Sequence, residues 1–524
     1  MTAEKSIFKN PNAGKALDES EIDYLKLVLT ARVYDVCIET PLQKALGLSS
    51  RLRNTILLKR EDLQPVFSFK CRGAYNKMAH LNENERRNGV IACSAGNHAQ
   101  GVALAASKLG IQSTIVMPSM APPIKWKNVQ RLGGSVLLHG NDFQESKDES
   151  ERLCKIKGLT NIPPYDDPLV IAGQGTIGVE ILRQYDASKI DAIFVCVGGG
   201  GLIAGIAAYV KKLYPNIKII GVETFDANAM TESLLAEKRV NLEQVGLFAD
   251  GAAVRNIGEE PFRIATSLVD EMVLVDTDEL CAAIKDVFED TRAILEPAGA
   301  LAVAGVKKYV QLNNITGGTF VTTCSGANMN FDRLRFVAER ADLGENTEAL
   351  ISVIIAEKPS SFLQLYECVY PRSVTEFAYR YGDKENAHIF MSLNLKDRHR
   401  ELPEVFQKLA DKGMKAIDAS HNEMAKAHAR YLIGGRKEVP DEKLFRFAFP
   451  ERPGALAHFL KSLNNPKWNV SLFHYRNDGG DVGKVMVGIQ VPAETSAEFA
   501  TFLSELKYPF VEETDNIVYQ QFLK

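Results

Sequence analysis

Lys70 is the residue of this sequence best suited to covalent chemistry. It stands in the segment SFKCRGA (68–74), just before a helical pattern, among Phe67, Phe69 and Cys71. Uncharged neighbours of this kind desolvate an amine, lower its pKa and make it nucleophilic. A lone lysine is more often a solvated surface residue, so this interpretation of Lys70 needs support from other segments.

Three turns of small residues offer that support. The segment SAGNHAQG (94–101) begins a helical pattern, and its small residues free the amides from Ser94 to His98 for a carboxylate. The segment VGGGGLIAG (197–205) also leads from an apolar run into a helical pattern, and Glu223 follows it. The segment CSGAN (324–328) places the hydroxyl of Ser325 after another apolar run.

The glycine-rich turn at 197–205 fits three interpretations by itself. Its amides can approach an oxyanion, so it can bind the pyrophosphate of a nicotinamide dinucleotide or a single phosphate group. It can also be a turn that only packs a helix onto a strand. The amine, the other two turns and the hydroxyl together favour a Schiff-base cofactor with a phosphate tail over a dinucleotide.

A mostly parallel sheet must position these residues. From Thr55 to about Phe336, short apolar runs alternate with helical patterns, which is typical of an open α/β fold with strands buried on both faces. Ligands of such folds bind at the carboxyl ends of the strands. We expect strands at 56–59, 90–93, 113–117, 135–138, 192–197, 218–222, 272–276 and 319–323. We expect helices at Asn97–Leu109, Lys125–Leu132, Gly175–Tyr185, Leu202–Tyr214 and Ala298–Val310.

The remaining part of the chain, from about residue 341, contains a repeat. The sequence FAYR at 377–380 recurs as FHYR at 473–476, and IFMSLN at 389–394 aligns with VMVGIQ at 485–490 at the same offset. Two copies of a βαββ-type unit predict a duplicated small sensor domain, with a pair of inert α+β modules as the alternative. The expected strands are 351–357, 388–395, 444–450 and 484–491, and the expected helices are 404–413 and 454–463.

Composition limits the classes of function. The 524 residues correspond to about three domains, and 45% hydrophobic with 24% charged residues is ordinary for a soluble globular protein. A formal charge of −4 excludes a dominant attraction to nucleic acid or to an anionic membrane. Eight single cysteines without a CxxC pair argue against a disulfide framework and a zinc site, and favour a reducing cytoplasm. The first residues also lack the pattern of a signal or transit peptide.

Six segments together resemble the fold-type II pyridoxal-phosphate enzymes, specifically the threonine deaminases. The segments are SFKCRGA (68–74), SAGNHAQG (94–101), DDPLVIAGQGT (166–176), GGGGLIAG (198–205), EPAGA (296–300) and TTCSGANMNF (322–331). The likeness continues through EMAKAHARYLIGG (423–435), PGALAHFL (453–460) and WNVSLFHYR (468–476), which look like the regulatory region of the biosynthetic, isoleucine-inhibited form. It implies a catalytic domain of two α/β subdomains at 1–340 and ACT-like regulatory domains at 341–435 and 436–524.

For the catalytic part, the resemblance implies pyridoxal 5′-phosphate held by Lys70 as a Schiff base. Asn97 would then bond to the ring hydroxyl, and Ser325 would face the pyridine nitrogen. The implied phosphate-binding amides are those of Gly198, Gly199, Gly200, Gly201 and Leu202. The implied carboxylate-binding turn is Ser94, Ala95, Gly96, Asn97 and His98. We expect Lys70 to be the base, His98 to contribute its backbone, and Glu296, just before Pro297, to cap a helix.

The implied reaction converts L-threonine to 2-oxobutanoate and ammonia, the first committed step of isoleucine biosynthesis. A hydroxyl opposite the ring nitrogen cannot keep that nitrogen protonated, which favours early loss of the β-hydroxyl over a long-lived carbanion. L-Serine should be a poorer substrate, because one missing methyl group is worth roughly 1–3 kcal/mol.

Two positions depart from the related serine racemases. Ala95 stands where those enzymes carry a second serine as an acid, and Ala229 stands where they carry an acidic cation ligand that follows the equivalent of Glu223. Both differences favour elimination over racemisation, and we expect no metal. The alternative function is a broad-specificity L-serine/L-threonine dehydratase or a serine racemase-like enzyme. An inactive amino-acid-binding regulator or a nicotinamide dehydrogenase is disfavoured by the intact lysine and turns.

For the regulatory part, the resemblance implies isoleucine as inhibitor and valine as a possible activator. The effector residues that it indicates are Tyr379, Glu451, Gly454, Leu456, Phe473 and Tyr475. Leu456 and Phe473 are equally well explained as core residues. The resemblance also implies a homotetramer, without nucleic-acid or membrane partners.

Overall fold

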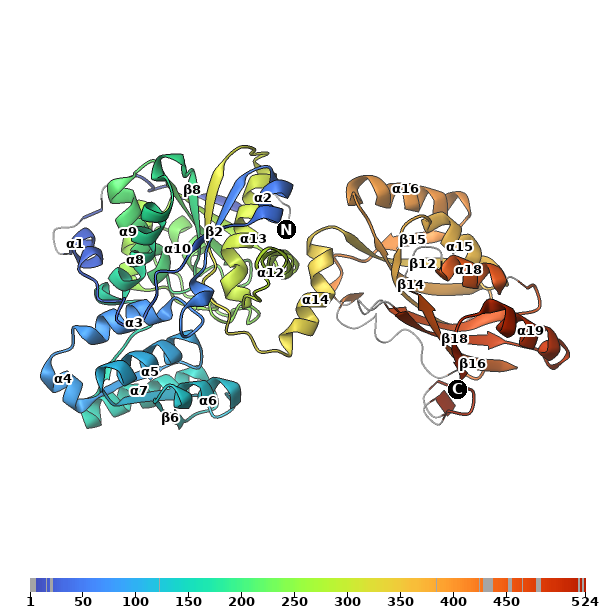
Figure 1. Ribbon diagram of the computed structural model, residues 1–524, viewed down its shortest axis with the longest axis horizontal. Coiled ribbons are helices and arrows are strands. Elements are labelled where there is room, and N and C mark those ends of the chain that lie inside the picture. The colour runs from blue at the N-terminus through green and yellow to red at the C-terminus, as the bar shows by residue number, and fades with distance from the viewer. Residues whose placement is uncertain are drawn as a thin grey trace. The chain divides into compact units, whose positions relative to one another are not determined.

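The computed structural model divides the chain into two units, Met1–Gly344 and Glu345–Lys524, each of which is described by itself (Figure 1). No helix among the described residues is both long and apolar enough to cross a membrane. Those residues also contain no cluster of three or more histidine, cysteine or acidic side chains that could hold a metal ion. The described residues are 6–15, 17–18, 22–121, 123–382, 384–423, 425–426, 437–450, 455–463, 465–476, 482–516, 519–520 and 523–524.

The larger sheet of the first unit has seven strands and forms its main core. Its inner strands are parallel, and antiparallel strands close both edges. The order is β1 (Ile7–Lys9), β10 (Glu271–Val275), β9 (Lys218–Thr224), β8 (Ala192–Cys196), β11 (Thr319–Thr323), β3 (Thr55–Lys59) and β2 (Leu42–Lys44). The apolar inner strands are buried, as continuous hydrophobic runs predict. The predicted α/β fold class is therefore confirmed.

A second, four-stranded parallel sheet forms a smaller subdomain in the same unit. Its order is β6 (Ser135–Leu138), β5 (Ser113–Met117), β4 (Val90–Cys93) and β7 (Thr160–Asn161). The helices between Lys70 and Lys157 are α3 (Lys70–Ala79), α4 (Glu83–Asn88), α5 (Asn97–Leu109), α6 (Pro123–Arg131) and α7 (Phe143–Lys157). Figure 1 shows this subdomain in blue to cyan, below the larger sheet.

The other helices of the first unit are associated with the larger sheet. They are α1 (Tyr24–Leu29), α2 (Leu46–Leu52), α8 (Pro168–Gln184), α9 (Gly201–Leu213), α10 (Ala229–Leu235), α11 (Glu259–Leu268), α12 (Thr277–Thr291), α13 (Pro297–Leu312) and α14 (Arg333–Gly344). Helix α8 starts well before the predicted Gly175–Tyr185. The Asp167 carboxylate caps the amides of Leu169 and Val170, and Pro168 suits the first turn.

The second unit is one antiparallel sheet of eight strands. The order is β15 (Lys415–Asp418), β12 (Glu348–Ala356), β14 (Asn386–Asn394), β13 (Val374–Arg380), β17 (Asn469–Arg476), β18 (Val482–Gln490), β16 (Glu442–Pro450) and β19 (Phe510–Glu512). Its helices are α15 (Ser361–Val369), α16 (Arg398–Asp411), α18 (Ala455–Ser462) and α19 (Ser496–Leu506). The first four strands come from the first repeat and the last four from the second, so the two copies share a single sheet.

The repeated segments themselves join the two copies. In the antiparallel pair β13–β17, Phe377 lies opposite Tyr475 and Tyr379 lies opposite Phe473. The first residue of each pair in one copy corresponds to the second residue of the other pair in the other copy. The repeat therefore pairs with itself around an approximate two-fold axis, which the sequence did not predict.

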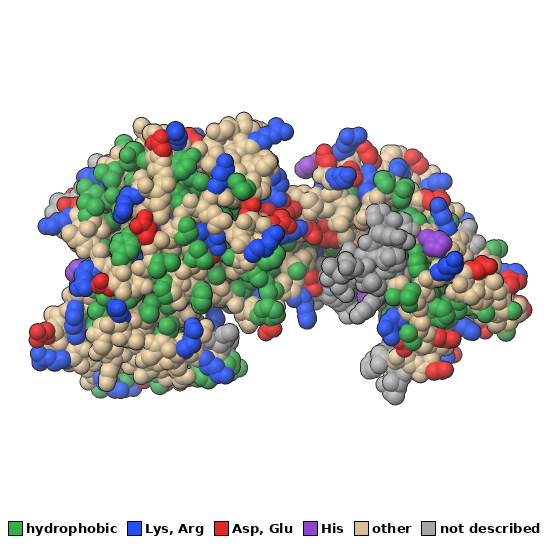
Figure 2. Space-filling view, in the orientation of Figure 1, with side chains coloured by type: hydrophobic (Ala, Val, Ile, Leu, Met, Phe, Trp, Pro, Cys, Tyr) green, Lys and Arg blue, Asp and Glu red, His purple; other side chains and the backbone are tan. Residues whose placement is uncertain are grey.

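The visible surface carries both signs of charge. Figure 2 shows Lys and Arg side chains interspersed with Asp and Glu on the face of each unit that is in view. This distribution agrees with the formal charge of −4. The face shown offers no extended basic surface of the kind that nucleic-acid binding uses.

Candidate active site

The predicted catalytic residues lie at strand ends and helix starts of the first unit. Asn97 begins α5 directly after β4, and Ser325 follows β11. Lys70 is the first residue of α3. The backbone amide of Phe69 donates to the Ser325 carbonyl at 3.2 Å, and the amide of Ala327 donates to the carbonyl of Phe67 at 2.9 Å. The segment before α3 is thus hydrogen-bonded to the segment after β11, which brings the Lys70 and Ser325 regions together.

The Lys70 amine is partly buried in apolar surroundings. Its Nζ donates to the Pro164 carbonyl at 2.9 Å and lies 5.2 Å from the centre of the Phe69 ring. Burial lowers the pKa of the amine to about 8, and the nearby Cys196 and Glu296 oppose this shift. A larger fraction of the amine is therefore neutral near physiological pH than in an exposed lysine, as a nucleophile or base requires.

The Asn97 carboxamide is hydrogen-bonded at both ends. Its Nδ2 donates to Glu296 Oε1 at 2.5 Å, and its Oδ1 accepts a bond from Asn328 Nδ2 at 2.7 Å. Glu296 does precede α13, but its side chain makes no capping hydrogen bond, so the predicted capping role is wrong. Burial raises the pKa of the Glu296 carboxyl to about 7, while the Asn97 hydrogen bond opposes this.

The turn before α5 has fewer free amides than the sequence suggested. The Ser94 amide donates to the Val116 carbonyl at 3.1 Å, as an extension of the sheet, and the Gly96 amide donates to Ser94 Oγ at 3.3 Å. The prediction that every amide from Ser94 to His98 is free is therefore wrong at Ser94. The first turn of α5 still directs unpaired helical amides toward this end of the sheet.

The His98 side chain is directed away from base chemistry. Its Nε2 donates to the Ile162 carbonyl at 2.7 Å, and the side chain is buried. Burial, together with the positive charge of Lys70, lowers the pKa of His98 to about 3. The ring is thus neutral at physiological pH and holds the start of α5 in place.

The glycine-rich turn lies between β8 and α9 and requires glycine for steric reasons. Gly200 has a φ of +92°, which favours glycine, and it precedes the first residue of the thirteen-residue helix α9. A Cβ atom on Gly199 would collide with the Tyr165 ring. Gly201 and Leu202 are buried beside them, and Gly198 is partly buried. The turn therefore brings backbone close to any group at the N-terminus of α9, where phosphate is favoured.

The Ser325 hydroxyl is buried and already has two partners. It donates to the Ala298 carbonyl at 3.3 Å and accepts a hydrogen bond from Cys196 Sγ at 3.2 Å. Burial raises the pKa of the Cys196 thiol to about 11, so the sulfur stays protonated and neutral. The group at the end of β11 is thus an uncharged hydroxyl supported by an uncharged thiol.

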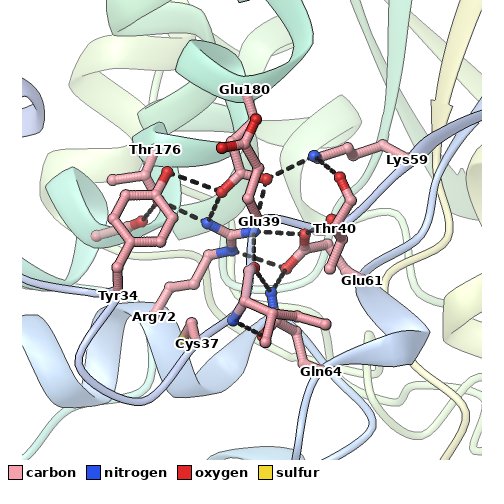
Figure 3. A network of polar contacts seen from close by, with 12 residues as sticks. Tyr34, Cys37, Glu39, Thr40, Lys59, Glu61, Gln64, Arg72, Thr176 and Glu180 are labelled. Carbon is pink, nitrogen blue, oxygen red and sulfur yellow. Dashed lines mark hydrogen bonds and ion pairs between the residues drawn. The ribbon is translucent and has the colours of Figure 1, made fainter. Parts of the chain in front are cut away.

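A buried ionic network holds the start of α3 in position (Figure 3). The Arg72 guanidinium contacts Glu61 at 2.7 Å and Glu180 at 2.5 Å, and Lys59 contacts Glu180 at 2.5 Å. None of these four side chains is exposed. Tyr34, Thr40, Gln64 and Thr176 supply further hydrogen bonds. Arg72 lies two residues after Lys70, so the network ties that end of α3 to η2 (Glu61–Leu63) and α8.

Several site residues carried no signal in the sequence. Asn328, Cys196, Tyr165 and Pro164 contact predicted site residues from distant positions in the chain. Asn328 stands in the quoted segment TTCSGANMNF, so proximity to Ser325 is the signal that could have found it. The others become recognisable only when the strands are assembled.

The candidate effector residues lie mostly on β13 and β17. The Tyr379 hydroxyl donates to Glu357, whose carboxylate also accepts a bond from Asn469 Nδ2 at 2.8 Å. Phe473 is 1% exposed and packs 4.9 Å from the Phe377 ring, as a core residue does. Tyr475 is buried and Leu456 is partly buried in the same core. Glu451 and Gly454 lie outside the described residues.

The first-unit residues fit pyridoxal phosphate as a set. A Schiff base needs a neutral amine, which Lys70 provides, and a phosphate needs a close backbone at a helix start, which the turn before α9 provides. Asn97 and Ser325 add uncharged hydrogen-bonding groups for a ring. An adenine dinucleotide would use none of this amine chemistry.

Two family descriptions match the chain. The family described as "Pyridoxal-phosphate dependent enzyme" matches residues 33–326. The family described as "C-terminal regulatory domain of Threonine dehydratase" matches twice, at residues 339–429 and 434–523.

Full-length relatives and solved structures agree with these matches. "Threonine dehydratase, mitochondrial" of Saccharomyces cerevisiae is 56% identical over 96% of this chain and 89% of its own. "L-threonine dehydratase biosynthetic IlvA" of Burkholderia multivorans is 53% identical over 96% and 99%. The processed form of threonine deaminase isoform 2 from Solanum lycopersicum is 48% identical, with a TM-score of 0.63 over 66% of this chain and 93% of that chain. A bacterial-type threonine deaminase, labelled T.th. in its description, is 36% identical, with a TM-score of 0.56 over 59% and 99%.

Proposed function

The chain belongs to the pyridoxal-phosphate-dependent enzymes and carries two copies of the threonine dehydratase regulatory domain, and on this premise we propose that it converts L-threonine to 2-oxobutanoate and ammonia. The β-hydroxyl leaves as water, and a later hydrolysis takes up one water and releases the nitrogen as ammonia. Relatives more than 50% identical over nearly the whole chain carry the name threonine dehydratase. The reaction makes the protein a carbon–nitrogen lyase.

The single observation that supports this function best is the pairing of Lys70 with Ser325. An amine with a pKa of about 8 is joined through its own segment to an uncharged hydroxyl at the end of β11. The bound cofactor supplies an electron sink for the bonds at the substrate Cα. Lys70 carries the cofactor and takes the proton from Cα, because it is the amine whose pKa is lowered for that task.

The other residues bind and orient. The amides of Gly198, Gly199, Gly200, Gly201 and Leu202 hold the phosphate group. The turn Ser94–His98 holds the substrate carboxylate through the amides that the sheet leaves unused. Asn97 binds the ring hydroxyl of the cofactor. Ser325 faces the ring nitrogen as an uncharged partner, which favours elimination over reactions that need a protonated ring.

Replacement of the amine tests this assignment. In Lys70→Ala, the visible absorbance of the purified protein and nearly all formation of 2-oxobutanoate from threonine should disappear. A matched control is Lys77→Ala on the same helix, where the amine pairs with Asp167 at 2.7 Å instead. That variant should keep both signals. Full activity in Lys70→Ala would remove Lys70 from the reaction.

Two features of the site disfavour racemisation. Ala95 offers no proton-donating side chain in the turn before α5. The Glu223 carboxylate accepts hydrogen bonds from the amides of Met230 and Thr231 at 2.9 Å and from the Thr231 hydroxyl at 2.7 Å. This carboxylate fastens β9 to α10, and Ala229 stands in place of a second acidic ligand. A racemase should release D-serine from L-serine, which chiral chromatography of the products would detect.

For the second unit, we propose feedback inhibition by isoleucine and activation by valine. The Tyr379 hydroxyl and Asn469 amide meet at Glu357, which places a carboxylate suited to an amino group beside aromatic side chains. Tyr475 and Leu456 complete the candidate site, with Phe473 as the core behind it. Tyr379→Phe should weaken isoleucine binding to the full-length chain, measured by calorimetry. Unchanged binding would remove Tyr379 from the effector site.

Assembly and compartment belong to the same proposal. We propose a homotetramer, which sedimentation of the purified chain would test, since a monomer or dimer would contradict it. All eight cysteines are free thiols in the structure, which supports a reducing compartment. We propose the cytoplasm, although the Saccharomyces cerevisiae relative is named as mitochondrial. Cell fractionation distinguishes the two compartments.

A further inference from the structure

The Asn97 carboxamide cannot turn over without breaking two hydrogen bonds. Its Nδ2 donates to Glu296 at 2.5 Å, and its Oδ1 accepts from Asn328 at 2.7 Å. A carboxylate only accepts and an amide nitrogen only donates, so these two partners define which end of Asn97 is oxygen and which is nitrogen. One hydrogen of Nδ2 bonds to Glu296, and the second hydrogen is left for another acceptor.

Asn328 extends this arrangement to the segment that carries the reactive lysine. The same Nδ2 that bonds to Asn97 also donates to the carbonyl of Val66 at 2.8 Å. Val66 lies four residues before Lys70 and is 1% exposed. The Asn328 side chain therefore connects the start of α5, the segment before α3 and the segment after β11.

The position of Glu296 is fixed by close packing. Its backbone amide donates to the Gly326 carbonyl at 3.1 Å, and a Cβ atom on Gly326 would collide with Glu296 Oε1. The Glu296 residue is 4% exposed. Its carboxylate therefore has little room to leave Asn97, and it does not cap α13, whose first turn would be its alternative partner.

We propose that Glu296 and Asn328 are positioning residues that orient the Asn97 carboxamide toward the cofactor ring, so that one N–H donor of Asn97 always faces the ring hydroxyl. This inference rests on the proposed function only in assigning Asn97 to the cofactor. Without the two partners, the carboxamide could rotate and present its oxygen to another oxygen. Cofactor binding would then weaken and its electronic state would change, while the reacting amine stayed intact.

The charge of Glu296 adds a second effect on the same site. Burial and Asp250 raise the pKa of the carboxyl to about 7, whereas Asn97, Lys125 and Arg333 oppose the shift. Its negative charge in turn raises the pKa of the Lys70 amine. The charged or titratable groups that face it are therefore Asp250, Lys125, Arg333, Lys70 and Cys196. A neutral side chain at 296 should make the visible spectrum of the holoenzyme less dependent on pH near neutrality.

The test uses the full-length holoenzyme without substrate. Glu296→Gln, Asn328→Ala, Asn97→Ala and the double variants with Asn97→Ala are compared by visible absorbance at several pH values and by the dissociation constant of pyridoxal phosphate. Each single variant should shift the spectrum and weaken cofactor binding by about tenfold, the value of one hydrogen bond to a charged group. In the Asn97→Ala background, Glu296→Gln and Asn328→Ala should add little, because they act through Asn97.

Glu223→Gln is the matched control. It removes another buried carboxylate whose pKa burial raises to about 7, but this one bonds to Met230 and Thr231 instead of Asn97. Its unfolding midpoint should fall without a change in spectrum or cofactor affinity. If Glu296→Gln does not fold, Asn328→Ala alone decides.

Two results would overturn the proposal. One is a spectrum unchanged by both single variants. The other is an equal effect of Glu296→Gln or Asn328→Ala with and without the Asn97 side chain. Formation of 2-oxobutanoate by the wild-type chain is measured separately. If that assay is negative while the cycle is non-additive, the proposed reaction fails and the positioning role remains.

Discussion

The Lys70 amine shows how burial alone prepares a residue for chemistry. Desolvation lowers its pKa from 10.5 to about 8, against the opposing charge of Glu296. Capture of a carbonyl compound needs the neutral amine, which predominates only above that pKa. The rate at which the cofactor-free chain captures pyridoxal phosphate should therefore rise with pH and level off above about pH 8, as stopped-flow absorbance would show. A rate that keeps rising to pH 10.5, as for a free lysine, would contradict the assignment.

Ser325 provides a test of reaction type. In Ser325→Asp, a carboxylate replaces a hydroxyl that now bonds to Cys196 and Ala298, and a buried carboxylate can protonate a ring nitrogen where a hydroxyl cannot. The fraction of threonine that is eliminated should fall relative to the fraction that is racemised or transaminated, as product analysis would show.

Ser325→Ala is the control for that experiment, since it removes the hydroxyl without adding charge. It should keep elimination as the dominant reaction at a reduced rate. An unaltered product ratio in Ser325→Asp would show that the group opposite the ring does not select the reaction.

At the scale of single residues, type and local context predicted the reactive groups but not their partners. Lys70 and Ser325 were found because an amine among apolar neighbours and a hydroxyl after a strand are visible locally. Glu296 was assigned to helix capping because Pro297 follows it, whereas its side chain bonds to Asn97, 199 positions away in the chain. Contacts over such separations depend on how strands are ordered, which local patterns do not reveal.

At the scale of elements, continuous apolar runs predicted the inner strands well, whereas helix α8 shows the limit of pattern reading. Its glycines at 173, 175 and 178 indicate a weak helix, and the helix was expected only from Gly175. In the structure a Cβ atom on Gly173 would lie 2.7 Å from the Arg72 carbonyl, so the glycine permits α8 to pack closely on α3. Tertiary packing outweighs helix propensity here.

The Arg72 network makes a prediction about how α3 is held. In Arg72→Met, Glu61 and Glu180 lose their shared guanidinium and stay buried, with Lys59 as the remaining cation. Removing one partner from a buried ion pair costs about 3–5 kcal/mol, so the free energy of unfolding in urea should fall by that amount. The cofactor should also dissociate more readily, because Lys70 begins the same helix.

Arg152→Met is the control for this variant. Arg152 pairs with Glu149 at 2.6 Å on the surface of α7, and 56% of its side chain is exposed. Solvent and salt screen such a pair, so its loss should leave the unfolding free energy nearly unchanged. Equal effects of the two variants would show that the buried network contributes no more than a surface pair.

At the scale of the whole molecule, the repeat predicted two regulatory copies but not their union. Alternating apolar residues identified strands 351–357, 388–395, 444–450 and 484–491, all of which the structure contains with shifted ends. The pairing of β13 with β17 through their repeated residues could not be predicted, because a repeat is compatible with separate sheets as well as with one. The shared sheet implies that the candidate effector residues of both copies lie on neighbouring strands.

Removal of the second unit tests the division of labour between the two units. A chain that ends at Gly344 keeps α14, which is bound to α12 through Arg340 and Asp278 at 3.1 Å and through Lys285 and Asp342. The T.th. threonine deaminase matches over 99% of its own length but only 59% of this chain, so a protein of that name exists without a counterpart for the rest. We expect the shortened chain to form 2-oxobutanoate from threonine at a rate close to that of the full-length chain, and to lose inhibition by isoleucine altogether.

The same experiment separates a regulatory role from a purely structural one. Inhibition requires a site whose affinity for isoleucine differs between two states of the protein, so the shortened chain should neither bind isoleucine nor respond to it. Its unfolding midpoint and bound cofactor, measured in parallel, show whether the catalytic unit is intact. If the intact shortened chain is still inhibited, isoleucine acts at the catalytic site and the second unit is no sensor. If it is intact but inactive with threonine, the second unit completes the active site itself, and the shared sheet would then have a catalytic function instead of a regulatory one.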